Sequence, residues 1–196
     1  NQVIENVGDV MLDVVRHFNK KYNESNILEN LCLNEKEYVL CTIHRAENVD
    51  DSENLGNIFE ALIQISKNIK VVLPIHPRTK NKLSNYIEKS ILDSLLIIDP
   101  LPYFDMQALS IKSKAIFTDS GGLQKEAFFH QVPCITLREE TEWVETVTSG
   151  WNELVGSNKE KIVSTFNNMK LPNKSENLYG DGHAANAIVN SMIKNL

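Results

Sequence analysis

The sequence predicts an α/β fold: a doubly wound, mostly parallel sheet of the Rossmann-like type. Short runs rich in β-branched residues are continuously apolar, which is typical of strands buried on both faces of a parallel sheet. Segments with helical periodicity lie between these runs, and the connections are short, as in βαβ units. At 196 residues, the chain has the length of one large domain.

Five segments are predicted as strands of this sheet. Each is short, apolar and bounded by polar or turn-forming residues. They are Glu37–Ile43, Lys70–Ile75, Ser94–Asp99, Lys114–Asp119 and Val132–Leu137.

Helices are predicted between the strands and at both ends of the chain. The clearest is Ser52–Ser66, where apolar residues recur on one face and Ser52 is the expected N-cap. Residues 79–92 and 122–130 fill later gaps, and residues 7–22 open the chain. A closing helix over 182–196 follows the glycine-bounded turn Tyr179–Gly182.

Composition excludes several classes of partner. The net charge is −6 with no lysine–arginine cluster, so a nucleic acid is not expected to bind. No apolar run approaches the roughly 20 residues that cross a bilayer, so a membrane is not expected either. The three cysteines are odd in number and widely spaced, which predicts buried thiols in a reducing compartment, the cytoplasm, and neither disulfides nor a metal site.

Polar residues follow each predicted strand directly. In an open parallel sheet, ligands bind beyond the carboxyl ends of the strands, where the strand order reverses. Polar clusters at five strand ends therefore indicate one shared ligand site. The clusters are His44–Asn48, His76–Arg78, Asp99-Pro100, Asp119–Gly122 and Arg138–Trp143.

The residue types in these clusters indicate a phosphorylated small molecule. Arginine guanidinium groups form bidentate pairs with phosphate oxygens. Ser120, Gly121 and Gly122 open a helix with free backbone N–H groups, and Glu126 follows where it could accept hydrogen bonds from a ribose diol. Taken alone the glycine pair is a weak signal, because a tight turn also uses such pairs, and both interpretations stay open.

Five motifs span nearly the whole chain and occur in a family's order. They are TIHRAEN (Thr42–Asn48), IHPR (Ile75–Arg78), TDSGGLQKE (Thr118–Glu126), LREETEWVET (Leu137–Thr146) and YGDGHAA (Tyr179–Ala185). Together they resemble the non-hydrolysing UDP-N-acetylglucosamine 2-epimerase family. Members of that family look like GT-B glycosyltransferases, in which two Rossmann-like domains face each other across a cleft. The resemblance covers the C-terminal, UDP-binding half.

The resemblance implies inversion at C2 of UDP-N-acetylglucosamine to give UDP-N-acetylmannosamine. UDP would be eliminated in an anti sense to leave 2-acetamidoglucal, and then added back after protonation of the opposite face. No redox or metal cofactor is implied. His44 corresponds to the family's active-site histidine near the diphosphate, where it would stabilise the departing UDP or transfer a proton. The UDP-binding residues implied are Ser120, Gly121 and Gly122 for the diphosphate, Glu126 for the ribose, and Arg138 for the nucleotide end.

Two further positions match a second UDP-sugar site that bacterial members use for activation: Arg45 and His76. The sequence also departs from the family pattern. Lys125 stands where members commonly carry another glutamate, and Met106 aligns near a base-stacking aromatic, for which Tyr103 or Phe104 is the alternative.

The predicted domain organisation is a single Rossmann-like UDP-binding domain over residues 1–196. Residues 1–25 form a linker plus first helix and 182–196 the closing helix. Because the chain begins with Asn1 inside a linker-like stretch, it is expected to be a piece of a longer protein that lacks the N-terminal domain. In the family that domain supplies the C2 acid and base and most of a homodimer contact, so this chain alone is predicted to bind UDP without epimerising it.

Three other interpretations stay open at this stage. The stretch HRAENVDD is also similar to relatives acting on UDP-diacetamido-uronic acids, which changes only the sugar. The nucleotide domain of a GT-B glycosyltransferase would share the fold but transfer sugar to an acceptor. A non-catalytic UDP-sugar-binding module is the third.

Overall fold

The computed structural model describes residues 4–75, 79–80, 93–172 and 177–195. Within these ranges, six strands form one parallel sheet in the order β3-β2-β1-β4-β5-β6. Their bounds are Tyr38–Thr42 (β1), Lys70–Pro74 (β2), Leu96–Ile98 (β3), Ile116–Thr118 (β4), Cys134–Thr136 (β5) and Asn152–Leu154 (β6). The five predicted strands are confirmed, and the doubly wound order places the reversal between β1 and β4.

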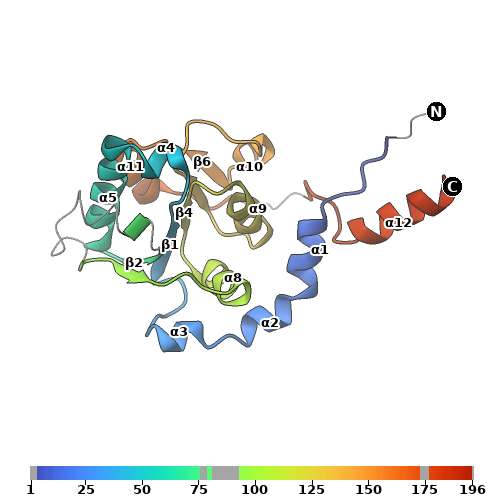
Figure 1. The fold of residues 1–196 in the computed structure, drawn as a ribbon, viewed down its shortest axis with the longest axis horizontal. Coiled ribbons are helices and arrows are strands. Elements are labelled where there is room, and N and C mark those ends of the chain that lie inside the picture. The colour runs from blue at the N-terminus through green and yellow to red at the C-terminus, as the bar shows by residue number, and fades with distance from the viewer. Residues whose placement is uncertain (1–3, 76–78, 81–92, 173–176, 196) are drawn as a thin grey trace.

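Helices cover both faces of the sheet (Figure 1). On β1, Val39 and Cys41 belong to the core that includes α5 (Ser52–Ser66) and α11 (Lys159–Asn168). Their neighbours Tyr38 and Leu40 belong to the opposite core. That second core includes α3 (Ile27–Asn30), α8 (Tyr103–Lys112) and α9 (Gly121–Phe129). Because successive strand residues point to opposite faces, a strand buried on both sides must be apolar throughout, as the sequence showed.

The helix predictions are partly confirmed. The bounds of α5 are those predicted, but its N-cap is Asp51, whose carboxylate accepts from the N–H groups of Glu53 and Asn54 at 2.9 Å each. The opening helix is interrupted at Phe18, giving α1 (Val10–His17) and α2 (Asn19–Asn23). The helix expected over residues 79–92 lies outside the described residues, except for residues 79–80.

Several elements were not predicted. They are α3, α4 (Ala46–Val49), α8, α10 (Val144–Thr148), α11 and β6. The segment Asn152–Leu154 contains no apolar run, and it is a strand because its backbone pairs with β5 at the sheet edge.

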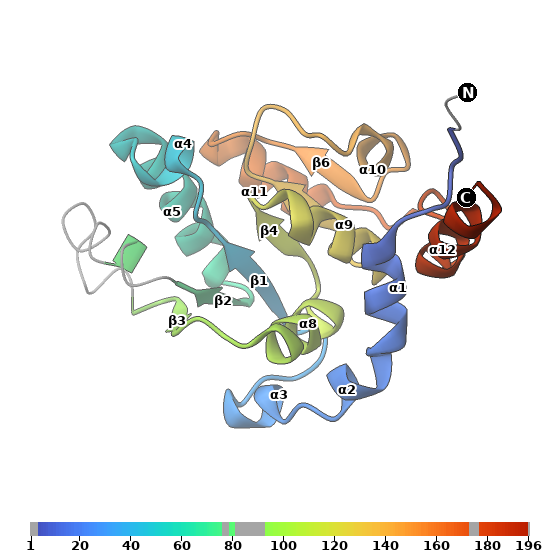
Figure 2. The ribbon, with the colours of Figure 1, turned by 45° about the vertical axis from the view of Figure 1, so that its right-hand side comes forward.

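The first helix, α1, lies beside the closing helix at the side of the sheet (Figure 2). The closing helix α12 (Ala184–Lys194) begins where the Asp13 carboxylate of α1 accepts from the N–H groups of Ala184, at 3.0 Å, and Ala185, at 2.7 Å. The N–H of Asp9 donates to the carbonyl of Tyr179 at 3.0 Å. These contacts attach α12 to the start of the chain.

Two of the three cysteines are buried as predicted, but Cys32 is exposed. It follows α3 with a φ of 51°, and its side chain faces solvent while the next residue, Leu33, is buried in the core. In the part of the chain that the structure describes, no helix combines the length and apolarity needed to span a membrane.

Candidate functional site

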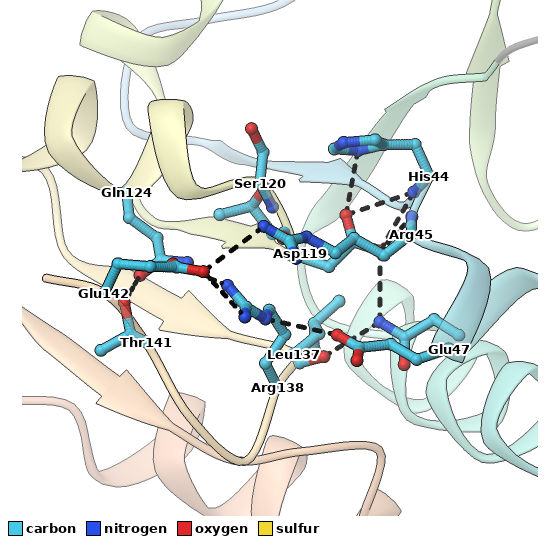
Figure 3. A network of polar contacts seen from close by, with 12 residues as sticks. His44, Arg45, Glu47, Asp119, Ser120, Gln124, Leu137, Arg138, Thr141 and Glu142 are labelled. Atoms are coloured by element: carbon cyan, nitrogen blue, oxygen red, sulfur yellow. Dashed lines mark hydrogen bonds and ion pairs between the residues drawn. The ribbon is translucent and has the colours of Figure 1, made fainter.

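The predicted site lies where β1, β4 and β5 end. Thr42 of β1 is in register with Thr118 of β4, which is in register with Thr136 of β5. The residues that follow these threonines therefore meet at the point where the strand order reverses, although they are far apart in sequence. Figure 3 shows the network of polar contacts formed there.

Asp119 is the buried centre of this network. Its side chain has no solvent exposure, and its carboxylate accepts from the backbone N–H groups of His44 at 3.0 Å and Arg45 at 2.9 Å. The amide of Asn48 donates to the same carboxylate at 3.2 Å and to the carbonyl of Leu137 at 2.9 Å. Three strand ends are thereby joined through two side chains.

His44 lies against this carboxylate but remains open to solvent. Its Nδ1 is 3.0 Å from Asp119 Oδ1, and its side chain is 58% exposed. The hydrogen bond with Asp119 raises the pKa of His44, while partial burial and nearby Arg45 act in the opposite direction. Burial acts to raise the pKa of Asp119, but the hydrogen bonds from His44, Arg45 and Asn48 outweigh it and lower that pKa.

Ser120 caps the helix that carries the glycine pair. Its hydroxyl accepts from the N–H of Leu123 at 3.4 Å, and its own N–H donates to the hydroxyl of Thr118 at 2.9 Å. Gly121 and Gly122 are the first two residues of α9, where helix geometry provides no acceptor for their N–H groups. The start of α9 therefore presents two backbone donors and the positive end of a helix dipole.

Neither glycine has the positive φ that would require glycine for the backbone alone. A Cβ at Gly122 would meet only the Ser120 hydroxyl, at 3.9 Å, whereas one at Gly121 would lie 3.2 Å from Trp143 Nε1. The tight-turn interpretation of the pair is therefore wrong. The backbone here is an ordinary helix start, which does not need the positive φ that glycine permits. The missing side chain of Gly122 leaves open space at the first turn of α9, whereas Gly121 is closely packed.

Arg138 is held by two carboxylates. Its side chain is 5% exposed, and its guanidinium donates to both oxygens of Glu142, at 2.9 and 3.1 Å. Arg138 Nε lies 3.3 Å from Glu47 Oε1, an ion pair without hydrogen-bond geometry. Glu142 raises the pKa of Arg138, and Arg138 lowers that of Glu142 to about 2. Arg45 NH2 is 3.8 Å from the same Glu142, so one carboxylate lies between two arginines.

Glu126 lies further along α9, in contact with α8. Burial raises the pKa of Glu126, and the side chains of Gln107 and Tyr103 oppose that shift as hydrogen-bonding neighbours. Gln107 is buried, and Tyr103 is 42% exposed. Glu126 is thus on the same helix as Ser120 but in a separate polar cluster.

Of two cavities in the described part of the chain, one lies near these elements and the other does not. One of about 340 Å³ opens beside Arg138 and is lined also by Glu47, Glu139 and Glu140, which makes it unfavourable for an anion. A larger one, of about 510 Å³, lies between α1 and the turn at 181–183, away from the strand ends. In the described ranges no group of three or more histidine, cysteine or acidic side chains could hold a metal ion.

Comparison with known proteins identifies the family. The family model described as UDP-N-acetylglucosamine 2-epimerase matches residues 1–193. The chain belongs to the UDP-N-acetylglucosamine 2-epimerase family. The resemblance that the five motifs indicated is confirmed. Membership of this family disfavours the alternative interpretation of the chain as the nucleotide domain of a GT-B glycosyltransferase.

Relatives and a solved structure agree with the family match. A UDP-N-acetylglucosamine 2-epimerase homolog of Methanococcus maripaludis is 46% identical over 100% of this chain and 56% of its own length. A UDP-2,3-diacetamido-2,3-dideoxy-D-glucuronate 2-epimerase of Pseudomonas aeruginosa is 41% identical, over 97% of this chain and 53% of its own. The Methanocaldococcus jannaschii UDP-GlcNAc 2-epimerase, solved in complex with UDP-GlcNAc and UDP, superposes with a TM-score of 0.83. The match has 36% sequence identity and covers 96% of this chain and 54% of that one.

The chain therefore spans about half the length of the 2-epimerases that it matches. The predicted α/β fold of the GT-B type is confirmed by the six-stranded parallel sheet and by this superposition.

The two departures from the family pattern have structural explanations here. Lys125 is buried and forms an ion pair with Asp9, and its ammonium lies 4.2 Å from the centroid of the Trp143 ring. It connects α9 to the start of the chain. Met106 packs partly buried against the core of α3, α8 and α9, while Tyr103 is the more exposed aromatic beside Glu126.

The structure brings together His44, Arg45, Ser120 and the glycine pair, with Arg138 beside them. His76 and Arg78 lie outside the described residues. Four residues of the network were not predicted to have a role: Asp119, Asn48, Glu47 and Glu142. All four stand inside the quoted motifs. Glu142 pairs with Arg138 of its own motif, whereas the partners of Asp119, Asn48 and Glu47 come from other strand ends, so the motifs gave no sign of them.

Proposed function

We propose that this chain is the UDP-binding half of an enzyme that converts UDP-N-acetylglucosamine to UDP-N-acetylmannosamine by elimination and re-addition of UDP. The observation that carries the proposal is the open N-terminus of α9 at the point of strand reversal, with His44 and Arg45 beside it. A helix start with free N–H groups and neighbouring cationic side chains suits a diphosphate.

Ser120, Gly121 and Gly122 are proposed to bind the diphosphate. The space in front of Gly122 supports this, because the packing of the protein itself does not require a glycine there. Glu126 is proposed to accept hydrogen bonds from the ribose hydroxyls. Its pKa is raised by burial, so hydroxyl donors would favour its charged form.

His44 is proposed as the catalytic residue of this half. An imidazolium beside the diphosphate would stabilise the negative charge that develops on departing UDP. Arg138, tied to Glu142 and Glu47, is proposed to act at the nucleotide end of the site by holding the loop in place. Arg45 and His76 are proposed to contribute to a second UDP-sugar site.

The residues that act on C2 are not assigned in this chain. We propose that they lie in the other half of the longer enzyme, which would close over the sugar and form most of a homodimer contact. Isolated, the 196-residue chain is expected to bind UDP without turnover. Epimerisation of UDP-N-acetylglucosamine by the pure chain would contradict this assignment.

A second substrate is supported by one observation. The Pseudomonas aeruginosa relative is a UDP-2,3-diacetamido-2,3-dideoxy-D-glucuronate 2-epimerase, with 41% identity. Turnover of the two UDP-sugars by the full-length enzyme distinguishes them, since the preferred substrate will show the higher kcat/KM.

The nucleotide site is tested by titrating UDP into the chain in a calorimeter. Ser120→Ala and Glu126→Ala are each expected to weaken binding about tenfold, because each removes a hydrogen-bonding group from the ligand. Ser164→Ala and Glu160→Ala, both exposed on α11 across the sheet, are the matched controls and should leave the affinity unchanged. Unaltered binding in both site variants would show that the nucleotide lies elsewhere.

A further inference from the structure

The carboxylate of Asp119 is surrounded by donors from one short segment. The backbone N–H groups of His44 and Arg45, the amide of Asn48 and the His44 imidazole all reach it, at 3.0, 2.9, 3.2 and 3.0 Å. The segment is the turn that follows β1 and begins α4, while Asp119 itself follows β4. A single buried side chain therefore sets the position of the whole turn.

Stability alone gives little reason for a charge at this position. Burying a carboxylate is costly, and a buried ion pair is weak evidence for stabilisation because neutral or apolar groups often serve as well. An asparagine could accept from the same backbone N–H groups. A neutral amide, however, carries a donor as well as an acceptor. Only the carboxylate is restricted to accepting a hydrogen bond from the ring of His44.

That restriction decides which nitrogen of the His44 imidazole carries a hydrogen. Because Asp119 Oδ1 lies 3.0 Å from His44 Nδ1, that nitrogen must carry the hydrogen. Nε2 is then the ring nitrogen left for a ligand, on a side chain that is 58% exposed. The same residue also fixes Arg45, whose Nε donates to the carbonyl of Asp119 at 3.1 Å.

We propose that Asp119 is a positioning residue of the UDP site, which holds His44 with its Nδ1–H toward the sheet and its Nε2–H free to donate to the diphosphate. In this arrangement His44 carries its positive charge while Asp119 remains a carboxylate, and no proton has to move between them. The choice of ligand rests on the proposed function, but the state of His44 does not.

Among the described residues, the charged groups that act on His44 are Asp119 and Arg45, and Glu142 lies beyond Arg45, 3.8 Å from its NH2. Asp119 favours the imidazolium and Arg45 disfavours it. If Asp119 is made neutral, the group that favours the imidazolium is lost while the charge of Arg45 remains.

The decisive experiment is an NMR titration of the histidine rings in the ligand-free chain. In Asp119→Asn the pKa of His44 is expected to fall below its value in the native chain, since the carboxylate has been replaced by a neutral group. Asn48→Ala is the matched control: it loosens the same turn, so the melting temperature should fall while the pKa of His44 stays raised. The proposal is overturned if folded Asp119→Asn keeps the native pKa, or if Asn48→Ala lowers it equally.

A measurement on the unaltered chain covers the case in which Asp119→Asn does not fold. Nitrogen-15 shifts of the neutral His44 ring, recorded above its pKa, should show hydrogen on Nδ1. Hydrogen on Nε2 would overturn the proposal.

UDP titrations at several pH values then test the consequence for the site. The affinity of the native chain should fall as the pH rises through the pKa of His44, and in Asp119→Asn the fall should move to lower pH. If the chain binds no UDP at any pH, the proposed function fails, whereas the NMR result still decides the role of Asp119.

Discussion

At the start of α9, two neighbouring glycines lack a side chain for different reasons. Gly121 faces Trp143 Nε1, which would lie 3.2 Å from an added Cβ, so its neighbours leave little room. Gly122 is exposed and faces open space. The same residue type is thus favoured by packing at one position and, in our proposal, by a ligand at the next.

Gly122→Ala is expected to separate binding from stability. Alanine is better than glycine in a helix by up to about 1 kcal/mol, so the free energy of unfolding should stay level or rise. UDP affinity should fall about tenfold or more, because the methyl group enters the space assigned to the diphosphate.

Calorimetric titration and urea denaturation measure the two effects. Gly56→Ala, inside α5 with no atom within 4 Å of the added Cβ, is the matched control, which should gain stability with unchanged affinity. Equal UDP affinity in Gly122→Ala and the native chain would remove the diphosphate from this position.

At the scale of elements, the start of a helix depends on which residue has the extended backbone conformation of an N-cap. Ser52 was the expected cap of α5, but Asp51 has the extended backbone and accepts the two hydrogen bonds. Both residues are common caps, and they are adjacent, so their types alone do not distinguish them. The backbone conformation entering the helix from α4 makes the choice.

Asp51→Ala is therefore expected to lower the free energy of unfolding by about 1 kcal/mol through loss of the cap. Ser52→Ala should change it by only a few tenths, since its side chain caps nothing and alanine suits a first helical turn. Urea denaturation of the two variants makes the comparison. A larger loss in Ser52→Ala than in Asp51→Ala would restore the sequence-based prediction.

At the scale of the whole molecule, two histidines, His130 and His44, should make the stability depend on pH in opposite directions. His130, at the end of α9, has its pKa lowered to about 4 by burial and by Lys36, and its Nε2 lies 2.7 Å from Gln107 Oε1. As the pH falls from about 6.5 to about 4, the unfolded chain binds a proton that the folded chain does not, so stability is lost. His44, whose pKa is raised, acts the other way, and its contribution is lost as the pH rises through that pKa.

His130→Gln is expected to reduce the loss of stability between pH 6.5 and 4 by at most about 3 kcal/mol, the value that the lowered pKa implies. Thermal melts across this range provide the measurement. A loss in His130→Gln as steep as in the native chain would show that another group is responsible.

Much of the fold could be predicted because its signals are local. Strands such as β1 and β4 are apolar on both faces, and α5 repeats its apolar residues at helical spacing. The segments that were missed lack such signals. Asn152–Leu154 contains no apolar run and becomes a strand by pairing with β5, and Phe18 interrupts a helical pattern without a glycine or proline.

The sequence by itself determined the fold class, the family and the strand ends at which a site would form. Apolar runs, helical periodicity and motif order are properties of neighbouring residues, so they can be read along the chain. Tertiary structure alone decided that Asp119 holds His44, Arg45 and Asn48, and that Glu142 lies between Arg45 and Arg138. These contacts join β1, β4 and β5. In the sheet β1 is the neighbour of β4, although β2 and β3 lie between them in the chain, and a charge acquires its partner only when such strands lie side by side.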